Sequence, residues 1–279
     1  KNPDYWGKNL NVKKGLDNFS IISVDYFRDG TAQFEAFKKG LFDIYPESDP
    51  VKWEKAYDFA AVQDGRVKKE AFITRSPAAM YGFFFNTRRK VFADRSVRTA
   101  LAMLFDFEWT NKNLFAGQYS RTGSFWQNSE LSALGVPASA GESALLAPFV
   151  AKVDAEVMSG AWRPAATDGS GRDREVMKKA VSLLSSAGFA IKNQKMSGAD
   201  GRPLAFEILS ANGAEEKLAL VFQRTLAKVG IDAIVRTVDD AQYQQRRQTW
   251  DYDMLLASLS SSLSPGIEQT GRWGSSSRD

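Results

Sequence analysis

The chain lacks the two side chains on which most nucleophilic and zinc chemistry depends. Its 279 residues contain no histidine and no cysteine. This excludes Ser-His-Asp and Cys-His devices and the usual zinc sites. Catalysis by paired carboxylates stays open, but the pairs Glu215-Glu216 and Asp239-Asp240 are adjacent in sequence and point in different directions. The residue types therefore favour binding over catalysis, and we expect no cofactor and no metal.

A short glycine-rich stretch, Asp168-Gly169-Ser170-Gly171, has some features of a phosphate-binding or metal-binding loop. A phosphate loop needs a following lysine and a calcium loop needs an acidic repeat, and neither is present. The stretch is better explained as a turn.

The charge balance argues against a nucleic-acid partner. The 37 basic and 33 acidic residues give a net charge of +4, and the clusters Arg88-Arg89-Lys90 and Arg246-Arg247 have acidic residues close by. A nucleic-acid binder gathers its excess positive charge into a patch or stripe. We interpret both clusters as solvated surface, and the absence of cysteine fits an oxidising compartment.

Hydrophobic periodicity predicts strands that alternate with helices, which indicates an α/β layered fold. One helix is expected to be capped by Thr31 and to end near Gly40. The other predicted helices are Arg95–Phe105, Glu175–Ala187 and Ala214–Val229. The predicted strands are Phe19–Phe27, Asp43–Tyr45, Arg66–Phe72, Ala79–Asn86, Leu204–Leu209, Ile231–Val238 and Tyr252–Leu259.

Several motifs together resemble one family. Lys1-Asn2-Pro3-Asp4-Tyr5-Trp6 opens the chain, and Phe85-Asn86-Thr87 is followed by a patterned stretch from Asp94 to Asp106. Leu183–Gly188 and Leu226–Ile231 add two further matches. These segments resemble the family 5 extracellular solute-binding proteins, which are peptide, dipeptide and nickel receptors of ABC importers.

Three further segments resemble one subgroup of this family. They are Asp25–Asp29, Arg121–Leu131 and Thr167–Gly171. The resemblance is to the subgroup that includes the Yej-type oligopeptide and microcin C receptors.

The resemblance implies a fold and a domain organisation. The expected fold is a lobe like those of type II periplasmic binding proteins, with a mixed sheet flanked by helices, mostly the C-terminal lobe of a two-lobe protein. Residues 1–75 would form the end of the first lobe and the hinge, 76–250 the second, ligand-clasping lobe, and 251–279 a cleft segment that starts the return. We expect the chain to be a fragment.

The resemblance also implies a function. A peptide or peptide-like ligand would be captured between two lobes and delivered to the transmembrane subunits of an ABC importer. The protein would be a periplasmic monomer of a Gram-negative bacterium. Another ligand, such as a sugar, an opine-like conjugate or a metal chelate, stays open, and so does a carboxylate-dependent hydrolase.

A serine run is the first candidate for the ligand site. Some family members fix the peptide amine with an aspartate, and Ser261 stands where that aspartate is expected. The neighbouring hydroxyls of Ser258, Ser260 and Ser262 can donate and accept hydrogen bonds. The alternative interpretation is that the serine run is only a flexible loop.

Two further groups of residues are candidates for the site. Arg121 is suited to a ligand carboxylate, Phe125 and Trp126 to a stacking wall, and Asn128 completes that segment. The alternative interpretation is that this segment is a structural turn whose aromatic side chains fill the core. Tyr81 and Phe83 are candidates for the cleft near the crossover, although such an aromatic strand is more often core.

Overall fold

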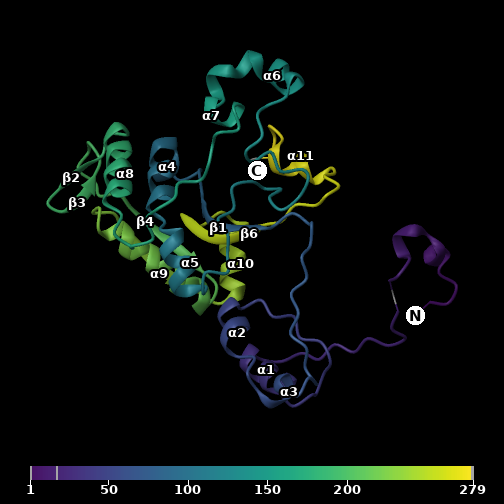
Figure 1. The fold of residues 1–279 in the computed structure, drawn as a ribbon. Helices are drawn as coiled ribbons and strands as arrows, with labels where there is room; N and C mark the ends of the chain where they lie inside the picture. Colours follow the sequence, from purple (N-terminus) through teal and green to yellow (C-terminus); the bar gives the residue numbers. More distant parts are fainter. Residues whose placement is uncertain (1, 17, 278–279) are drawn as a thin grey trace. The chain divides into compact units, whose positions relative to one another are not determined.

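The computed structural model describes residues 2–16 and 18–277, which form two compact units, Lys1–Lys69 and Glu70–Asp279 (Figure 1). The division lies close to the boundary expected near residue 75. Residues 251–277 belong to the second compact unit. The assignment of these segments to lobes stays a prediction. Among the described residues, no helix is long and apolar enough to cross a membrane.

The first unit is built around short helices and clustered aromatic rings. Phe34 and Phe37 on one helix pack against Tyr45, with ring centroids 5.6 and 5.3 Å apart. The Asp29 side chain, rather than that of Thr31, caps this helix by accepting hydrogen bonds from two backbone N–H groups. The elements are η1 (Trp6–Asn9), η2 (Asn11–Lys13), α1 (Gly30–Lys38), α2 (Pro50–Lys55) and α3 (Ala60–Gln63).

Three predicted strands are absent. The segments Phe19–Phe27, Asp43–Tyr45 and Arg66–Phe72 have no strand assignment in the described part of the chain. The side chains of Ile21 and Tyr26 are 80% and 94% exposed. An alternating pattern predicts a strand only if another strand pairs with it, and these segments have no such neighbour in the described residues.

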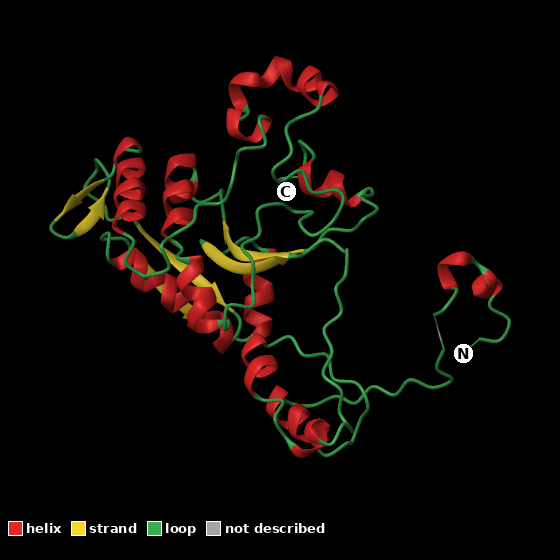
Figure 2. Cartoon of the chain, in the orientation of Figure 1, coloured by secondary structure: helices red, strands yellow, loops and turns green. Residues whose placement is uncertain are grey.

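The second unit contains a mixed sheet of four strands in the order β1-β6-β4-β5 (Figure 2). Strand β1 is antiparallel to β6, whereas β4 is parallel to both β6 and β5. All four strands lie at the predicted places. They are β1 (Met80–Phe85), β4 (Ala205–Ser210), β5 (Asp232–Thr237) and β6 (Met254–Leu259).

Both faces of this sheet are covered by helices. Ile208 and Met254 lie in the main core with residues of α4 (Arg95–Leu104), α8 (Arg174–Ser186) and α9 (Gly213–Ala227). Their strand neighbours Leu209 and Leu255 lie in a second cluster with Tyr243 of α10 (Asp240–Gln248). Successive strand residues therefore serve opposite faces, as the pleat requires. The predicted mixed sheet flanked by helices is confirmed.

The remaining elements of the second unit were not predicted. Several are short, and they carry too few apolar residues to show a period. They are η3 (Lys90–Phe92), α5 (Phe107–Leu114), α6 (Ala140–Leu146), η4 (Ala147–Lys152), α7 (Ala155–Met158), α11 (Glu268–Trp273) and the antiparallel hairpin of β2 (Ala190–Lys192) and β3 (Lys195–Ser197).

Candidate ligand-binding site

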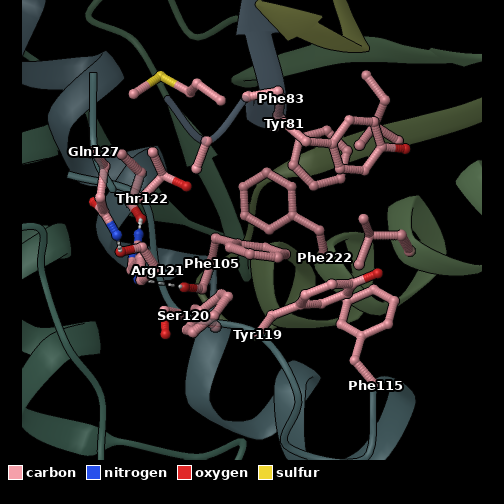
Figure 3. A pocket seen from close by; sticks show the side chains of 18 of the residues that line it. Tyr81, Phe83, Phe105, Phe115, Tyr119, Ser120, Arg121, Thr122, Gln127 and Phe222 are labelled. Atoms are coloured by element: carbon pink, nitrogen blue, oxygen red, sulfur yellow. Dashed lines mark hydrogen bonds between the residues drawn. The ribbon is translucent and has the colours of Figure 1, made fainter. Parts of the chain in front are cut away.

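A cavity of about 820 Å³ lies within the second unit beside strand β1 (Figure 3). Its volume is in the range of small-molecule sites. Most of its wall is apolar, and eight aromatic side chains contribute to it. These are Tyr81, Phe83, Phe85, Phe105, Phe107, Phe115, Tyr119 and Phe222.

Regular secondary structure places the rings at the centre of this wall. Tyr81 and Phe83 are two residues apart on β1, and their side chains therefore lie on the same face of the strand. Phe105 follows the last residue of α4, and Phe222 belongs to α9. The ring centroids of Phe83, Phe105 and Phe222 are 5.0 to 5.6 Å apart, which is ordinary aromatic packing.

A buried aspartate fixes the turn between Phe105 and Phe107. Asp106 is 8% exposed, and its carboxylate accepts hydrogen bonds from the backbone N–H groups of Trp109 and Gly171, each at 2.9 Å. The hydroxyl of Thr167 lies within hydrogen-bond distance of the same carboxylate and of the Glu108 carboxylate, which share its one proton. Asp106 therefore caps α5 and ties it to the 167–171 loop, which supports the structural explanation of the Asp-Gly-Ser-Gly stretch.

Arg121 lies in the cavity wall, but much of its hydrogen-bonding capacity is already used. Its two terminal nitrogens donate to the carbonyl oxygens of Phe105 and Ala102, at 3.4 and 3.2 Å. These carbonyls lie at the C-terminal end of α4, where a cation is favourable. Burial lowers the pKa of Arg121, while the carboxylates of Glu108 and Asp106 act in the opposite direction. A role for Arg121 with a ligand carboxylate stays a prediction.

The structure brings together two candidate segments that lie far apart in the sequence. The indole nitrogen of Trp126 donates to the carbonyl oxygen of Ser262 at 3.2 Å. The ring of Phe125 packs against Trp273, with centroids 4.8 Å apart, and Arg272 donates to the carbonyl oxygen of Ser260. The two segments therefore support one another beside the sheet.

The predicted residues differ in their relation to the cavity. Tyr81, Phe83, Arg121 and Asn128 line it. The lining does not include Phe125 and Trp126, or the serines Ser258, Ser260, Ser261 and Ser262. Any ligand role for these six residues stays a prediction.

Two of these candidates have notable polar environments. The side-chain amide of Asn128 donates to the carbonyl oxygens of Thr74 and Ser76, both at 3.0 Å, and its backbone φ of 70° is left-handed. The hydroxyl oxygen of Ser261 is buried and has no hydrogen-bond partner among the described residues. Asn128 therefore shapes the rim, and Ser261 retains hydrogen-bonding capacity.

Tyr81 stands at the rim of the cavity with its side chain about half exposed. Burial, followed by the charge of Glu215, raises the pKa of Tyr81 to about 12. The phenol is therefore neutral at physiological pH and can both donate and accept a hydrogen bond.

We expect Tyr81→Phe to remove one phenol that ionises near pH 12 in the folded protein. A raised pKa means that the folded chain holds this proton after the unfolded chain has released it. The stability that Tyr81 contributes is therefore present below pH 10 and is lost as the pH rises towards 12. Alkaline titration of phenolate absorbance, for wild type and variant, measures the missing step. In concentrated urea the same step should appear near pH 10, and a step near pH 10 in both states would contradict the prediction.

Several cavity residues were not recognised as site residues from the sequence. Phe105 and Phe222 lie in the predicted helices Arg95–Phe105 and Ala214–Val229, and a helical apolar pattern marks a residue as core without showing that a cavity adjoins it. For Phe115 and Tyr119 the sequence carried no period. Asp106, which fixes the turn between two of the rings without lining the cavity itself, stands in a family motif that gives it no role.

The comparisons with known proteins agree with the geometry. The family model of bacterial extracellular solute-binding proteins, family 5 Middle, matches residues 1–279. A binding protein of Brucella melitensis is 57% identical over the whole chain, which covers 45% of that protein. The peptidoglycan-binding protein YepA of Agrobacterium fabrum is 50% identical, with 100% of this chain and 46% of that protein covered.

A third relative confirms the predicted subgroup. It is named "Probable peptide-binding protein YejA", also from Agrobacterium fabrum, and it is 37% identical, with 99% of this chain and 45% of that protein covered. The chain thus spans a little under half the length of the curated relatives it matches. This agrees with the expectation that it is a fragment.

Solved structures show the same fold. NikA from Brucella suis, in complex with Fe(III)-EDTA, has a TM-score of 0.59 and 19% identity, with 85% of this chain and 41% of NikA covered. The oligopeptide-binding protein AppA from Bacillus subtilis, in complex with a nonapeptide, has a TM-score of 0.57 and 19% identity, with 85% and 40% covered. The family match over the whole chain carries the assignment: the chain belongs to the bacterial extracellular solute-binding proteins, family 5.

Proposed function

We propose that this chain is part of the substrate-binding component of an ABC importer that captures a peptide or peptide-like solute. The observation that carries the proposal is the aromatic cavity of about 820 Å³ beside β1 in a family 5 fold. The relatives YejA, named as a peptide-binding protein, and YepA, named as a peptidoglycan-binding protein, support a peptide-containing ligand. Periplasmic location, a monomeric state and contact with the transmembrane subunits of the importer are parts of the same proposal.

Strand β1 offers a means of holding a peptide by its backbone. It pairs with β6 on one side and is the edge of the sheet in the described residues. An extended peptide that adds to such an edge gains backbone hydrogen bonds without regard to its sequence. Its side chains would then reach the cavity beside the strand.

A fragment of peptidoglycan that carries a peptide is a specific form of this ligand. YepA, named as a peptidoglycan-binding protein, is 50% identical over the whole of this chain. Both a free peptide and a peptidoglycan peptide present the backbone and apolar groups that the β1 edge and the cavity accommodate. The experiment therefore tests the two sources separately.

Thermal unfolding of the complete encoded protein tests the proposal. A ligand that binds only the native state raises the midpoint, and at about 100 times its Kd it adds about 2.7 kcal/mol. We expect a rise with a mixed pool of short peptides, with peptides released from peptidoglycan, or with both. Oligosaccharides and nickel chelates serve as comparison pools. A rise with those pools alone would contradict the proposal.

A further inference from the structure

We infer that the aromatic cavity accepts an uncharged, apolar side chain of the bound solute and discriminates against a cationic one. This inference rests on the proposed function, since it names the ligand chemistry of the same site. Three observations support it: the charged groups around the cavity, the hydrogen bonds that these groups already make, and the aromatic rings of the wall.

Among the described residues, the wall holds no carboxylate that would neutralise a positive charge. No aspartate or glutamate lines the cavity in the described part of the chain, and Arg121 is its one charged lining residue there. Arg121 is itself cationic, and its terminal nitrogens donate to Phe105 and Ala102. An ammonium group that entered would lose its water without gaining a counter-ion, which is unfavourable.

The two carboxylates whose charges act on Arg121 are engaged with other groups. Asp106 accepts from Trp109 and Gly171, and Glu108 accepts from the backbone N–H and the hydroxyl of Thr167. These contacts hold both carboxylates toward the 167–171 loop. They do not belong to the cavity lining.

A third carboxylate, that of Glu215, acts on Tyr81 through its charge. Its side chain accepts a hydrogen bond from the backbone N–H of Ala211 at 2.8 Å, and it too is absent from the lining. The amide of Gln127 in the wall is likewise engaged, since it accepts from the backbone N–H of Gly123 and donates to the carbonyl oxygen of Arg121. The side chains that remain for a ligand are largely rings.

The burial of apolar surface favours binding of an apolar side chain in this cavity. Phe83, Phe105 and Phe222 form a contiguous cluster, and Phe115 and Tyr119 pack edge to face at 4.9 Å further along the wall. A phenyl or branched aliphatic side chain that fills this space leaves water and meets ring faces and edges. Figure 3 shows these labelled rings gathered around one space.

Calorimetry with the complete encoded protein measures the selection. The probes are synthetic peptides in which each position in turn carries phenylalanine or lysine in a background of alanine and glycine. At the position that reaches the cavity, we expect phenylalanine to bind about 10-fold to 100-fold more tightly than lysine. At positions that remain in water, the two should differ little.

A charge variant tests whether the cavity is the source of this selection. Gln118 lines the cavity and is exposed, so Gln118→Glu introduces a carboxylate of nearly the same shape. The ratio of phenylalanine to lysine affinity should fall at least threefold in this variant. Gln248→Glu makes the same charge change on exposed helix α10, away from the lining, and should leave the ratio unchanged.

The outcomes separate the two proposals. If the peptides do not bind at all, the proposed function fails along with this inference. If peptides bind but phenylalanine and lysine are equivalent at every position, the proposed function stands and this inference is overturned. A ratio that changes equally in Gln118→Glu and Gln248→Glu also overturns it, because the selection then reflects overall charge.

Discussion

Replacing Gly230 by alanine should lower the free energy of unfolding by roughly 3 kcal/mol or more. Gly230 has a φ of 80°, in the left-handed region that a residue with a Cβ adopts at a cost. An added Cβ would stand 2.8 Å from both the carbonyl oxygen of Gln194 and the backbone nitrogen of Met196. Those are backbone atoms of the β2–β3 hairpin, so relief requires the hairpin to move. Chemical denaturation measures the loss.

Gly188 provides a matched control for this substitution. It follows helix α8 as Gly230 follows α9, with a φ of 88°. In each case the next N–H bonds back to the helix, from Phe189 to Leu184 and from Ile231 to Leu226. No atom lies within 4 Å of a Cβ at Gly188, so Gly188→Ala should cost only about 1 to 2 kcal/mol.

The difference between the two variants isolates the close approach of the hairpin. Met196 donates to the carbonyl oxygen of Gly230 at 2.8 Å, and Met196 is fully buried in the main core. That contact holds the end of α9, the helix that carries Phe222 into the cavity wall. Equal losses in Gly230→Ala and Gly188→Ala would contradict this account, because the backbone angle alone would then explain both.

The second large effect is expected for Asp106→Ala, which should lower the free energy of unfolding by roughly 3 kcal/mol. The substitution removes the cap of α5 and leaves the N–H groups of Trp109 and Gly171 without an acceptor. It also removes one of the two carboxylate acceptors of the Thr167 hydroxyl, which keeps Glu108. Part-buried donors that lose their acceptor on a buried aspartate cost more than the loss of an exposed cap.

Asp94→Ala is the control for Asp106→Ala. Asp94 caps α4 by accepting from the N–H of Ser96 at 2.7 Å, but its side chain is exposed. Its loss should cost about 1 kcal/mol. Both free energies can be measured by urea denaturation.

The Asp106→Ala variant also has an expected consequence for binding. Asp106 lies between Phe105 and Phe107, and both of these rings line the cavity. At temperatures where the variant is still folded, its affinity for a bound solute should fall, whereas that of Asp94→Ala should not. Wild-type affinity in Asp106→Ala would show that the turn does not position the wall.

Much of the second unit could be predicted because its signals are local. Helices α4, α8 and α9 show an apolar face at a spacing of three to four residues, and Gly188 and Gly230 mark two of their ends. Apolar runs between turns predicted all four strands of the sheet. Helix α10 was not predicted because only one of its nine side chains, that of Tyr243, is buried, so its sequence shows no apolar period.

The strand predictions failed where no pairing supports them. Phe19–Phe27 has the composition of a strand, yet all of its apolar side chains except Phe27 are exposed, and no strand lies beside it in the described residues. The hairpin of β2 and β3 shows the reverse case, since β2 is exposed throughout and has no apolar pattern on which a prediction could rest. Pairing and tertiary contact decide such segments, whatever their propensity.

By itself, the sequence determined the family, the α/β class, the periodic helices and the absence of histidine and cysteine chemistry. These follow from residue types and short spacings that can be read without a partner. Only the tertiary structure decided that Phe83, Phe105 and Phe222 meet at one cavity, that Arg121 bonds to the end of α4, and that Trp126 contacts Ser262. Each of these contacts joins residues far apart along the chain, and the order of the strands and the packing of helices on them determine which side chains meet.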